Sequence, residues 1–166
     1  MSIVVVVVAV VVVLTIWVMW TATRVDRLHT RTDAARASLD AQLVRRAAAV
    51  QALVERAGDR LDAAVAGRMK TAARAALEAD DGAREAAEND LGRVLQELPA
   101  GVSDPDLMRD LRDAASRVVL ARRFYNDAVR DTRSLRGRRM PRLLRLGGRR
   151  PVPAFFEIDD TTPSAT

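Results

Sequence analysis

The chain carries one uninterrupted apolar run near its amino terminus, "IVVVVVAVVVVLTIWVMW" at residues 3–20. Thr15 is the only polar side chain in this run, and the first charged side chain of the sequence is Arg24. A run of this length is typical of a helix that crosses a lipid bilayer. Lipid offers no hydrogen-bond partner to free backbone groups, so the segment must be helical in order to span it. We predict a transmembrane helix over residues 1–23, with Trp17 and Trp20 at the membrane interface.

A cleaved signal peptide is the alternative interpretation of the same run. It is disfavoured because no basic residue precedes the run, and because "VMWTATR" places a tryptophan where a small residue should precede the cut. Basic residues favour the cytoplasmic side of a span, and four of them follow this one closely: Arg24, Arg27, Arg31 and Arg36. We therefore expect a single-pass protein of the cell membrane with its amino terminus outside and the rest of the chain in the cytoplasm.

Residues 24–57 contain neither proline nor glycine and predict a long helix. Apolar or small side chains recur there at alternating steps of three and four, the period of a helix with one buried stripe. The stripe consists of Val25, Leu28, Thr32, Ala35, Leu39, Leu43, Ala47, Val50, Leu53 and Ala57, and Leu61 continues it. Because nothing interrupts the chain before this stretch, one continuous rod is expected to run from the membrane into the cytoplasm.

Turn-forming residues divide the rest of the chain. Breaks are expected near Gly58, at "EADDG" (78–82) and at "LPAGVSDPD" (98–106), after which Ser103 and Asp106 form a capping box. The predicted helices are 24–57, 59–79, 83–97 and 104–134. Glycine inside a helix costs only about 1 kcal/mol, so the pattern leaves open whether the first two helices are separated near Gly58.

The last predicted helix has an apolar row close to a strict heptad: Leu107, Leu111, Ala114, Val118, Ala121, Tyr125, Val129 and Thr132. Short connections favour antiparallel neighbours. The predicted fold is therefore all-α, with the amino-terminal transmembrane helix, an antiparallel up-and-down four-helix bundle at 24–134, and a basic, flexible tail at 135–166.

The pair Tyr125-Asn126 stands inside this charged helical pattern. Tyr125 falls on the predicted buried row, where its ring packs and its hydroxyl needs a partner. Asn126 lies one step round the helix, at the seam with a neighbour. We interpret the pair as a buried polar clamp between helices, and a ligand contact is the alternative.

Two short motifs and a tail feature invite comparison with a known family. The first motif is "LVRRAAAVQALVE" (43–55), a double arginine followed by an apolar row: Arg45, Arg46, Val50, Leu53 and Val54. The second is R-x-x-Y-N, carried by Arg122, Tyr125 and Asn126. Phe155 and Phe156 form an aromatic pair near the end of the chain.

In this order, behind a charge-free span, these features resemble the LemA family of bacterial membrane-anchored helical proteins. The sequence departs from the family pattern at Gln51-Ala52, at Arg133 and at Met140-Pro141. The departures indicate a divergent branch. The resemblance implies a four-helix cytoplasmic domain on a single membrane anchor.

The predicted tail contains an arginine-rich segment, "RGRRMPRLLRLGGRR" (136–150), without one acidic residue. Its seven arginines are Arg136, Arg138, Arg139, Arg142, Arg145, Arg149 and Arg150. Leucines interleave them, and anionic headgroups attract such segments at about 1 kcal/mol per basic residue. Contact with anionic lipid or an acidic partner is predicted, and a solvated arm is the alternative. Nucleic acid is disfavoured because no aromatic residue stands among the arginines to stack on bases.

Little in the sequence favours catalysis. It has no cysteine and one histidine, His29, which is expected on the rod surface. Glutamates such as Glu88 and Glu97 stand near the spacing of the Nudix hydrolase box, but Ala100 and Gly101 occupy positions where a cation needs carboxylates. We predict no enzymatic activity, no catalytic or metal-binding residue and no cofactor.

The predicted function is that of a membrane-anchored scaffold or adaptor of the LemA type. Its expected partners are the lipid bilayer, anionic headgroups and other membrane proteins. Alanine in the apolar stripe leaves room for close helix approach, so a homo-oligomer stays open. The alternative is a regulatory or accessory subunit of a membrane-associated hydrolase or protease.

Overall fold

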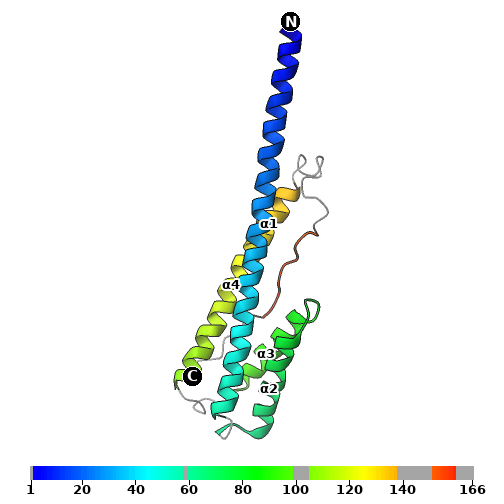
Figure 1. The fold of residues 1–166 in the computed structure, drawn as a ribbon. Coiled ribbons are helices and arrows are strands. Elements are labelled where there is room, and N and C mark those ends of the chain that lie inside the picture. Colours follow the sequence, from blue (N-terminus) through cyan, green and yellow to red (C-terminus); the bar gives the residue numbers. More distant parts are fainter. Residues whose placement is uncertain (1, 58–59, 99–104, 138–150, 160–166) are drawn as a thin grey trace. The chain divides into compact units, whose positions relative to one another are not determined.

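The computed structural model describes residues 2–57, 60–98, 105–137 and 151–159 (Figure 1). These ranges hold the helices α1 (Ser2–Ala57), α2 (Ala63–Glu78), α3 (Arg84–Gln96) and α4 (Pro105–Gly137), and no strand. The prediction of an all-helical protein is confirmed for this part of the chain. Helix α1 ends at Ala57 and α2 begins at Ala63, so the first two helices are separate elements.

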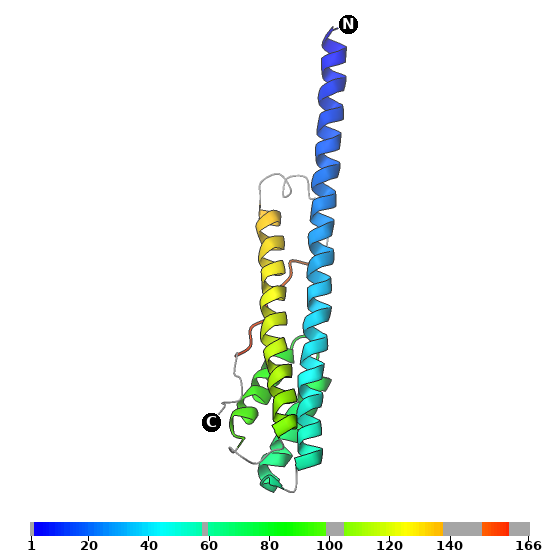
Figure 2. The same cartoon turned by 90° about the vertical axis from the view of Figure 1, so that its left-hand side faces the viewer.

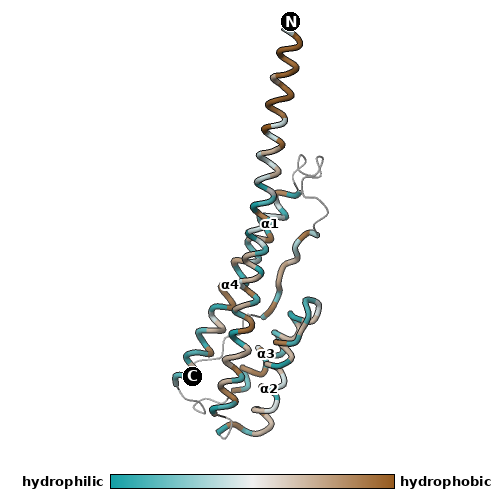
Figure 3. The backbone as a smooth tube through the Cα atoms, viewed as in Figure 1, coloured by the Kyte–Doolittle hydropathy of each residue, from teal (hydrophilic) through white to brown (hydrophobic). Residues whose placement is uncertain are grey.

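The apolar run belongs to α1 and continues without a break into the charged part of the same helix (Figure 3). This helix is long and apolar enough to cross a membrane, and none of its most apolar eighteen-residue window is buried. The hydroxyl of Thr15 donates to the main-chain oxygen of Val11 at 2.8 Å, which satisfies that hydroxyl inside the apolar stretch. At the other end of the run, the Arg24 guanidinium lies 5.7 Å from the ring centroid of Trp20.

The chain forms two compact units. The first consists of Met1–Ala35 and Asn126–Phe155, and therefore contains the amino-terminal part of α1 and the carboxy-terminal part of α4. Its buried contacts are polar as well as apolar. The hydroxyls of Thr32 and Thr132 are 2.9 Å apart, and Arg31 pairs with Asp131 at 3.3 Å on the surface.

The second unit consists of Arg36–Tyr125 and Phe156–Thr166 and holds the larger core. The predicted stripe of α1 is buried throughout its part in this unit, as are Leu107 to Tyr125 of the predicted α4 row. Helices α2 and α3 add Met69, Ala73, Leu91 and Leu95. The spacing of apolar residues therefore correctly predicted most of the buried side chains of α1 and α4 in this unit.

Side chains define both ends of α2. The Asp62 carboxylate accepts hydrogen bonds from the backbone N–H groups of Ala64 (2.8 Å) and Val65 (3.3 Å). At the other end, Arg84 Nη1 donates to the main-chain oxygen of Ala76 at 2.5 Å, one of the last carbonyls of the helix. Asp80 then accepts from the N–H of Ala83 at 2.9 Å, directly before α3.

The observed ends of α2, α3 and α4 differ from the predicted ones by more than one residue in two places. Helix α2 begins at Ala63 rather than at 59, because Asp62 is its N-cap, a signal that the sequence-based assignment missed. Helix α4 continues to Gly137, three residues beyond the predicted end at 134. The proposed capping box at Ser103 lies outside the described residues.

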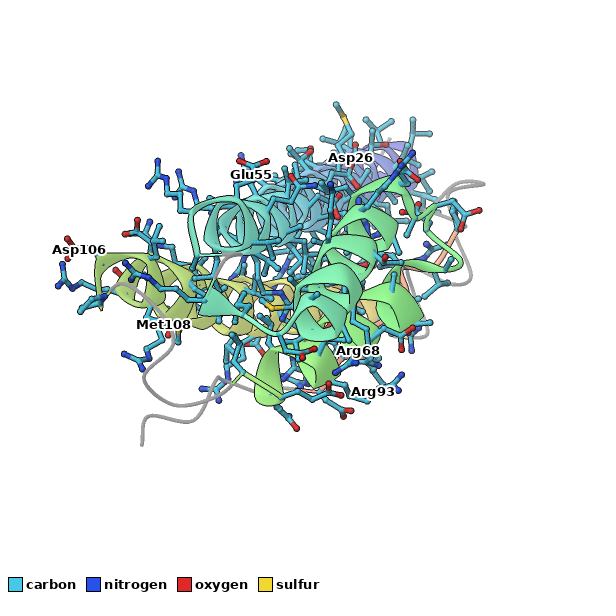
Figure 4. The ribbon with its side chains drawn as sticks, turned by 90° about the horizontal axis from the view of Figure 1, so that it is seen from below. Asp26, Glu55, Arg68, Arg93, Asp106 and Met108 are labelled. Carbon is cyan, nitrogen blue, oxygen red and sulfur yellow. The ribbon has the colours of Figure 1, made fainter. Side chains whose placement is uncertain are left out.

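The N-cap of α2 leads to a prediction about stability. Asp62→Ala leaves two backbone donors at the start of α2 without their carboxylate, so the free energy of unfolding should fall by about 1 kcal/mol. Urea unfolding of the full chain in detergent, followed by circular dichroism, measures the change. Glu55→Ala is the matched control: Glu55 is exposed at the surface of α1 (Figure 4), and its loss should change stability by less than about 0.5 kcal/mol. Equal effects of the two substitutions would contradict the capping role.

Candidate functional site

A buried ion pair lies between α1 and α3. Arg46 Nη2 is 2.5 Å from Glu88 Oε2 and also donates to the main-chain oxygen of Glu88 at 3.1 Å. Only 3% of Arg46 and 1% of Glu88 is exposed. Two charges removed from water in this way must hold each other in place, because neither can be hydrated.

The pair is only partly satisfied. Within the described ranges, Arg46 Nε and Glu88 Oε1 have no protein hydrogen-bond partner. Burial raises the pKa of Glu88 above its ordinary value, and this effect outweighs the opposing influence of Arg46 and, more weakly, Arg84. Desolvation therefore dominates the electrostatics at this position, although the carboxylate is in direct contact with a guanidinium.

A second cluster gathers around Arg36 of α1. Its guanidinium pairs with Asp81 at 2.8 Å and with Asp40 at 3.4 Å. The same group lies 5.7 Å from the ring centroid of Tyr125 and 5.3 Å from that of Phe156, within the range of cation–π attraction. Burial lowers the pKa of Arg36, but Asp40, Asp81 and Tyr125 together raise it above its ordinary value, so the guanidinium stays charged.

The carboxy-terminal part of the second unit contains a short extended segment that lies along α3. The N–H groups of Glu157 and Asp159 donate to Glu85 Oε1 at 2.9 Å and to Asn89 Oδ1 at 2.8 Å. Alternate residues of an extended chain are about 6.8 Å apart, close to one turn of a helix, so two N–H groups meet two successive turns of α3. Phe156 and Ile158 are the buried members of the alternation.

In the first unit, residues 151–155 contact the end of α4. Arg133 Nε donates to the main-chain oxygen of Pro153 at 2.9 Å, and its guanidinium lies 4.6 Å from the ring centroid of Phe155. Arg136 Nη1 donates to the main-chain oxygen of Pro151 at 3.2 Å. The domain boundary expected from the sequence assigned these residues to a flexible tail, whereas residues 151–159 carry specific contacts in both units.

The structure brings some of the sequence-predicted residues together. Tyr125 is buried, as the heptad row predicted, and the structure places it beside Arg36. Arg122 and Asn126 are half-buried on the same helix. Arg46 is buried in the pair with Glu88, a partner that the sequence did not suggest. Of the arginine-rich segment only Arg136 can be placed; Arg138, Arg139, Arg142, Arg145, Arg149 and Arg150 lie outside the described residues.

The expectation for His29 was wrong. This residue was assigned to the rod surface, but only 6% of it is exposed. His29 and Thr32 are three residues apart and share one face of α1, and Thr32 contacts Ala128 and Thr132 of α4.

Two grooves flank the helices of the second unit. One, of about 470 Å³, is lined by α1 and α4; the other, of about 780 Å³, is lined by α2 and α3 and bordered by Arg68 and Arg93 (Figure 4). The described residues contain no group of three or more His, Asp or Glu side chains placed to hold a metal ion. Comparisons of the chain with protein-family models, with curated proteins and with solved structures find no match.

The buried pair predicts a characteristic mutational pattern. Arg46→Met and Glu88→Leu each leave one buried group without its partner and should lower the free energy of unfolding by about 3 kcal/mol. The double substitution Arg46→Met with Glu88→Leu removes both charges and should recover most of that loss. Urea unfolding of the full chain in detergent measures all three variants. Additive losses in the double variant would contradict the coupling.

The raised pKa of Glu88 predicts a pH dependence of definite sign. The folded chain binds this proton more tightly than the unfolded chain does. The Glu88 contribution to the free energy of unfolding should therefore fall as the pH rises from the ordinary value of 4.5 through the raised pKa, and stay level above it. The difference in stability between the natural chain and the Arg46→Met, Glu88→Leu double variant, measured from pH 4 to 8, isolates this contribution. If the free energy of unfolding of the natural chain minus that of the double variant rises with pH, the raised pKa of Glu88 is contradicted.

Proposed function

We propose that this protein is a membrane-anchored scaffold or adaptor of the LemA type, held by one transmembrane helix with its helical bundle at the cytoplasmic face. One observation carries the proposal. The apolar window of α1 is not buried against any of the residues that the structure describes, while the same helix continues into a packed core. A soluble protein would expose this row of valines to water at a high cost, since each buried CH₂ is worth about 0.8 kcal/mol.

The arrangement that we propose for the second unit is an antiparallel up-and-down bundle. Arg36 of α1 lies beside Tyr125 of α4, whereas residues 45–56 of α1 line one groove with residues 107–117 of α4. Residue numbers thus rise along α1 as they fall along α4. The two views in Figures 1 and 2 draw these helices side by side, which supports the same arrangement.

The positions of the motif residues support the family resemblance. Arg46, Val50 and Leu53 of the first motif are buried, as is Tyr125 of the second and Phe156 of the aromatic pair. Part of each motif therefore lies in the core of the second unit, while Arg45 is exposed and Arg122 and Asn126 are half-buried. Residues that hold helices together are what a family with a shared scaffold would retain.

The proposed role is one of shape and surface rather than of chemistry. Glu88 is the carboxylate whose pKa is raised, a property often found in catalytic groups. Glu88 is only 1% exposed, and its carboxylate pairs with Arg46 rather than facing an open cleft. Both the buried pair and the Arg36 cluster act between helices, so we assign them to rigidity. The arginine-rich segment would add contact with anionic headgroups.

Cysteine labelling tests the anchor and its direction. The natural chain has no cysteine, so Ser2→Cys and Lys70→Cys each introduce a single thiol, before the span and on the exposed side of α2. A membrane-impermeant maleimide should label Ser2→Cys in intact cells and Lys70→Cys only after permeabilisation, and the chain should stay in the pellet after carbonate extraction. Labelling of Lys70→Cys in intact cells would contradict the proposed topology. Extraction of the chain by carbonate would contradict the proposed membrane anchor.

A further inference from the structure

The groove of about 470 Å³ in the second unit is lined by residues of α1 and α4, and none of its lining residues belongs to α2 or α3. Alanines form much of its lining, with charged side chains along both walls. Its residues are Arg45, Ala48, Ala49, Ala52 and Arg56 of α1 and Leu107, Asp110, Asp113, Ala114 and Arg117 of α4. Small side chains at the centre permit close approach of another helix.

Large apolar side chains continue this groove along α4. Leu120 is 53% exposed and Phe124 is 68% exposed, although each is large enough to fill a core position. Leu120 lies three residues after Arg117, and Phe124 four residues after Leu120, so both extend the α4 wall by successive turns. An exposed phenylalanine and leucine that continue one groove form an apolar surface of the kind that contacts a partner.

The α1 wall is continued by small side chains at the same level. Ala41 and Ala37 precede Arg45 by four and eight residues, and both are exposed. Arg36 lies beside Tyr125, so in the proposed antiparallel pair Ala37 is level with Phe124, and Ala41 is level with Leu120. The surface thus carries two large side chains on α4 and two alanines on α1 in matching positions.

The charged side chains of the groove divide mostly by sign between its two walls, and Arg117 on the α4 wall is the exception. Arg45 and Arg56 stand on the α1 wall, and Asp110 and Asp113 on the α4 wall. Among the described residues, none of these four side chains forms an ion pair, whereas other surface arginines such as Arg68 and Arg130 do. A partner that presents an acidic wall to α1 and a basic wall to α4 would satisfy all four.

We propose that the occupant of this surface is a second copy of the chain, packed face to face so that α1 of each copy lies over α4 of the other. Phe124 and Leu120 of one copy then pack on Ala37 and Ala41 of its partner. Arg45 and Arg56 approach the aspartates of the opposite α4. Such an interface is isologous, because the same patch serves both copies.

The proposed membrane anchor favours this face-to-face arrangement over others, and the proposed dimer therefore rests on the proposed function. Two copies that enter the same bilayer through the amino-terminal end of α1 must hold their α1 helices in the same direction. A two-fold axis parallel to the helices meets this condition, and it places each α1 over the opposite α4 without change of level. Arg117 lies near the level of Arg45 and repels it, so the apolar pairs provide most of the association.

Crosslinking between two differently tagged full-length chains tests the geometry. Ala41→Cys and Leu120→Cys chains, reconstituted together in proteoliposomes and treated with a short bismaleimide, should give a mixed dimer. Ala41→Cys with Lys70→Cys is the matched control and should give at least tenfold less, because Lys70 lies on α2. Equal yields from the two mixtures would overturn the interface. A protein absent from the carbonate pellet would instead refute the anchor.

Substitutions at the surface test the energetics. The double variant Leu120→Ser, Phe124→Ser should weaken dimerisation in detergent at least tenfold by sedimentation. Val152→Ser, at a residue that is 52% exposed, should leave dimerisation unchanged.

A charge exchange tests the polar contacts of the same interface. Asp113→Arg should also weaken the dimer, and adding Arg45→Asp should restore it. Unaltered melting temperatures show that these exposed substitutions leave the fold intact. A natural chain that sediments as a monomer, or a charge exchange that fails to restore the dimer, would contradict the proposal.

Discussion

The burial of one face of α1 is the constraint on which the rest of the structure depends. From Leu39 to Leu61 every member of the predicted stripe is buried, and α2, α3 and α4 all contribute side chains to the core that covers it. A helix with a single apolar stripe cannot remain alone in water, because each exposed leucine forgoes about 1.5–3 kcal/mol of burial. The stripe continues the helix that carries the apolar run, so one element links the proposed anchor to the packed core.

The core contains a charged contact that apolar packing alone does not require. Replacing a buried ion pair by apolar side chains is often neutral or stabilising, so Arg46 and Glu88 are weak evidence for extra stability. Their effect is directional: a guanidinium that meets both the carboxylate and the main-chain oxygen of Glu88 permits one alignment of α1 and α3. Arg36 acts similarly, with carboxylates and aromatic rings around one guanidinium. We regard both arginines as determinants of helix register.

The outer side of the α1 and α4 pair differs from this closed interior. It combines alanines, charged side chains that form no ion pair with any described residue, and the exposed side chains of Leu120 and Phe124. A scaffold needs a rigid interior and an exposed recognition surface, and the two properties lie on opposite faces of the same helices. The proposed dimer would give this outer face a partner, while the groove between α2 and α3 would remain free for others.

Periodicity by itself determined much of the fold. The apolar run, the stripe of α1 and the row of α4 each follow from residue spacing along a single helix, where neighbours are set by geometry within the chain. Those assignments required no knowledge of contacts between helices, and they identified the candidate membrane helix and most of the core. Tyr125 could be assigned to the interior for the same reason.

Only the tertiary structure decided which distant residues meet. The sequence offered no partner for Glu88, which pairs with Arg46, 42 residues away in the sequence. His29 is buried on the face of α1 that it shares with Thr32, which contacts α4, and Phe156 is buried in a segment that lies along α3. No local pattern encodes these contacts. The exposure of Phe124 likewise depends on which face of α4 its neighbours leave open. Local spacing determines which side of a helix is apolar, but partner choice depends on how separate elements are brought together in space.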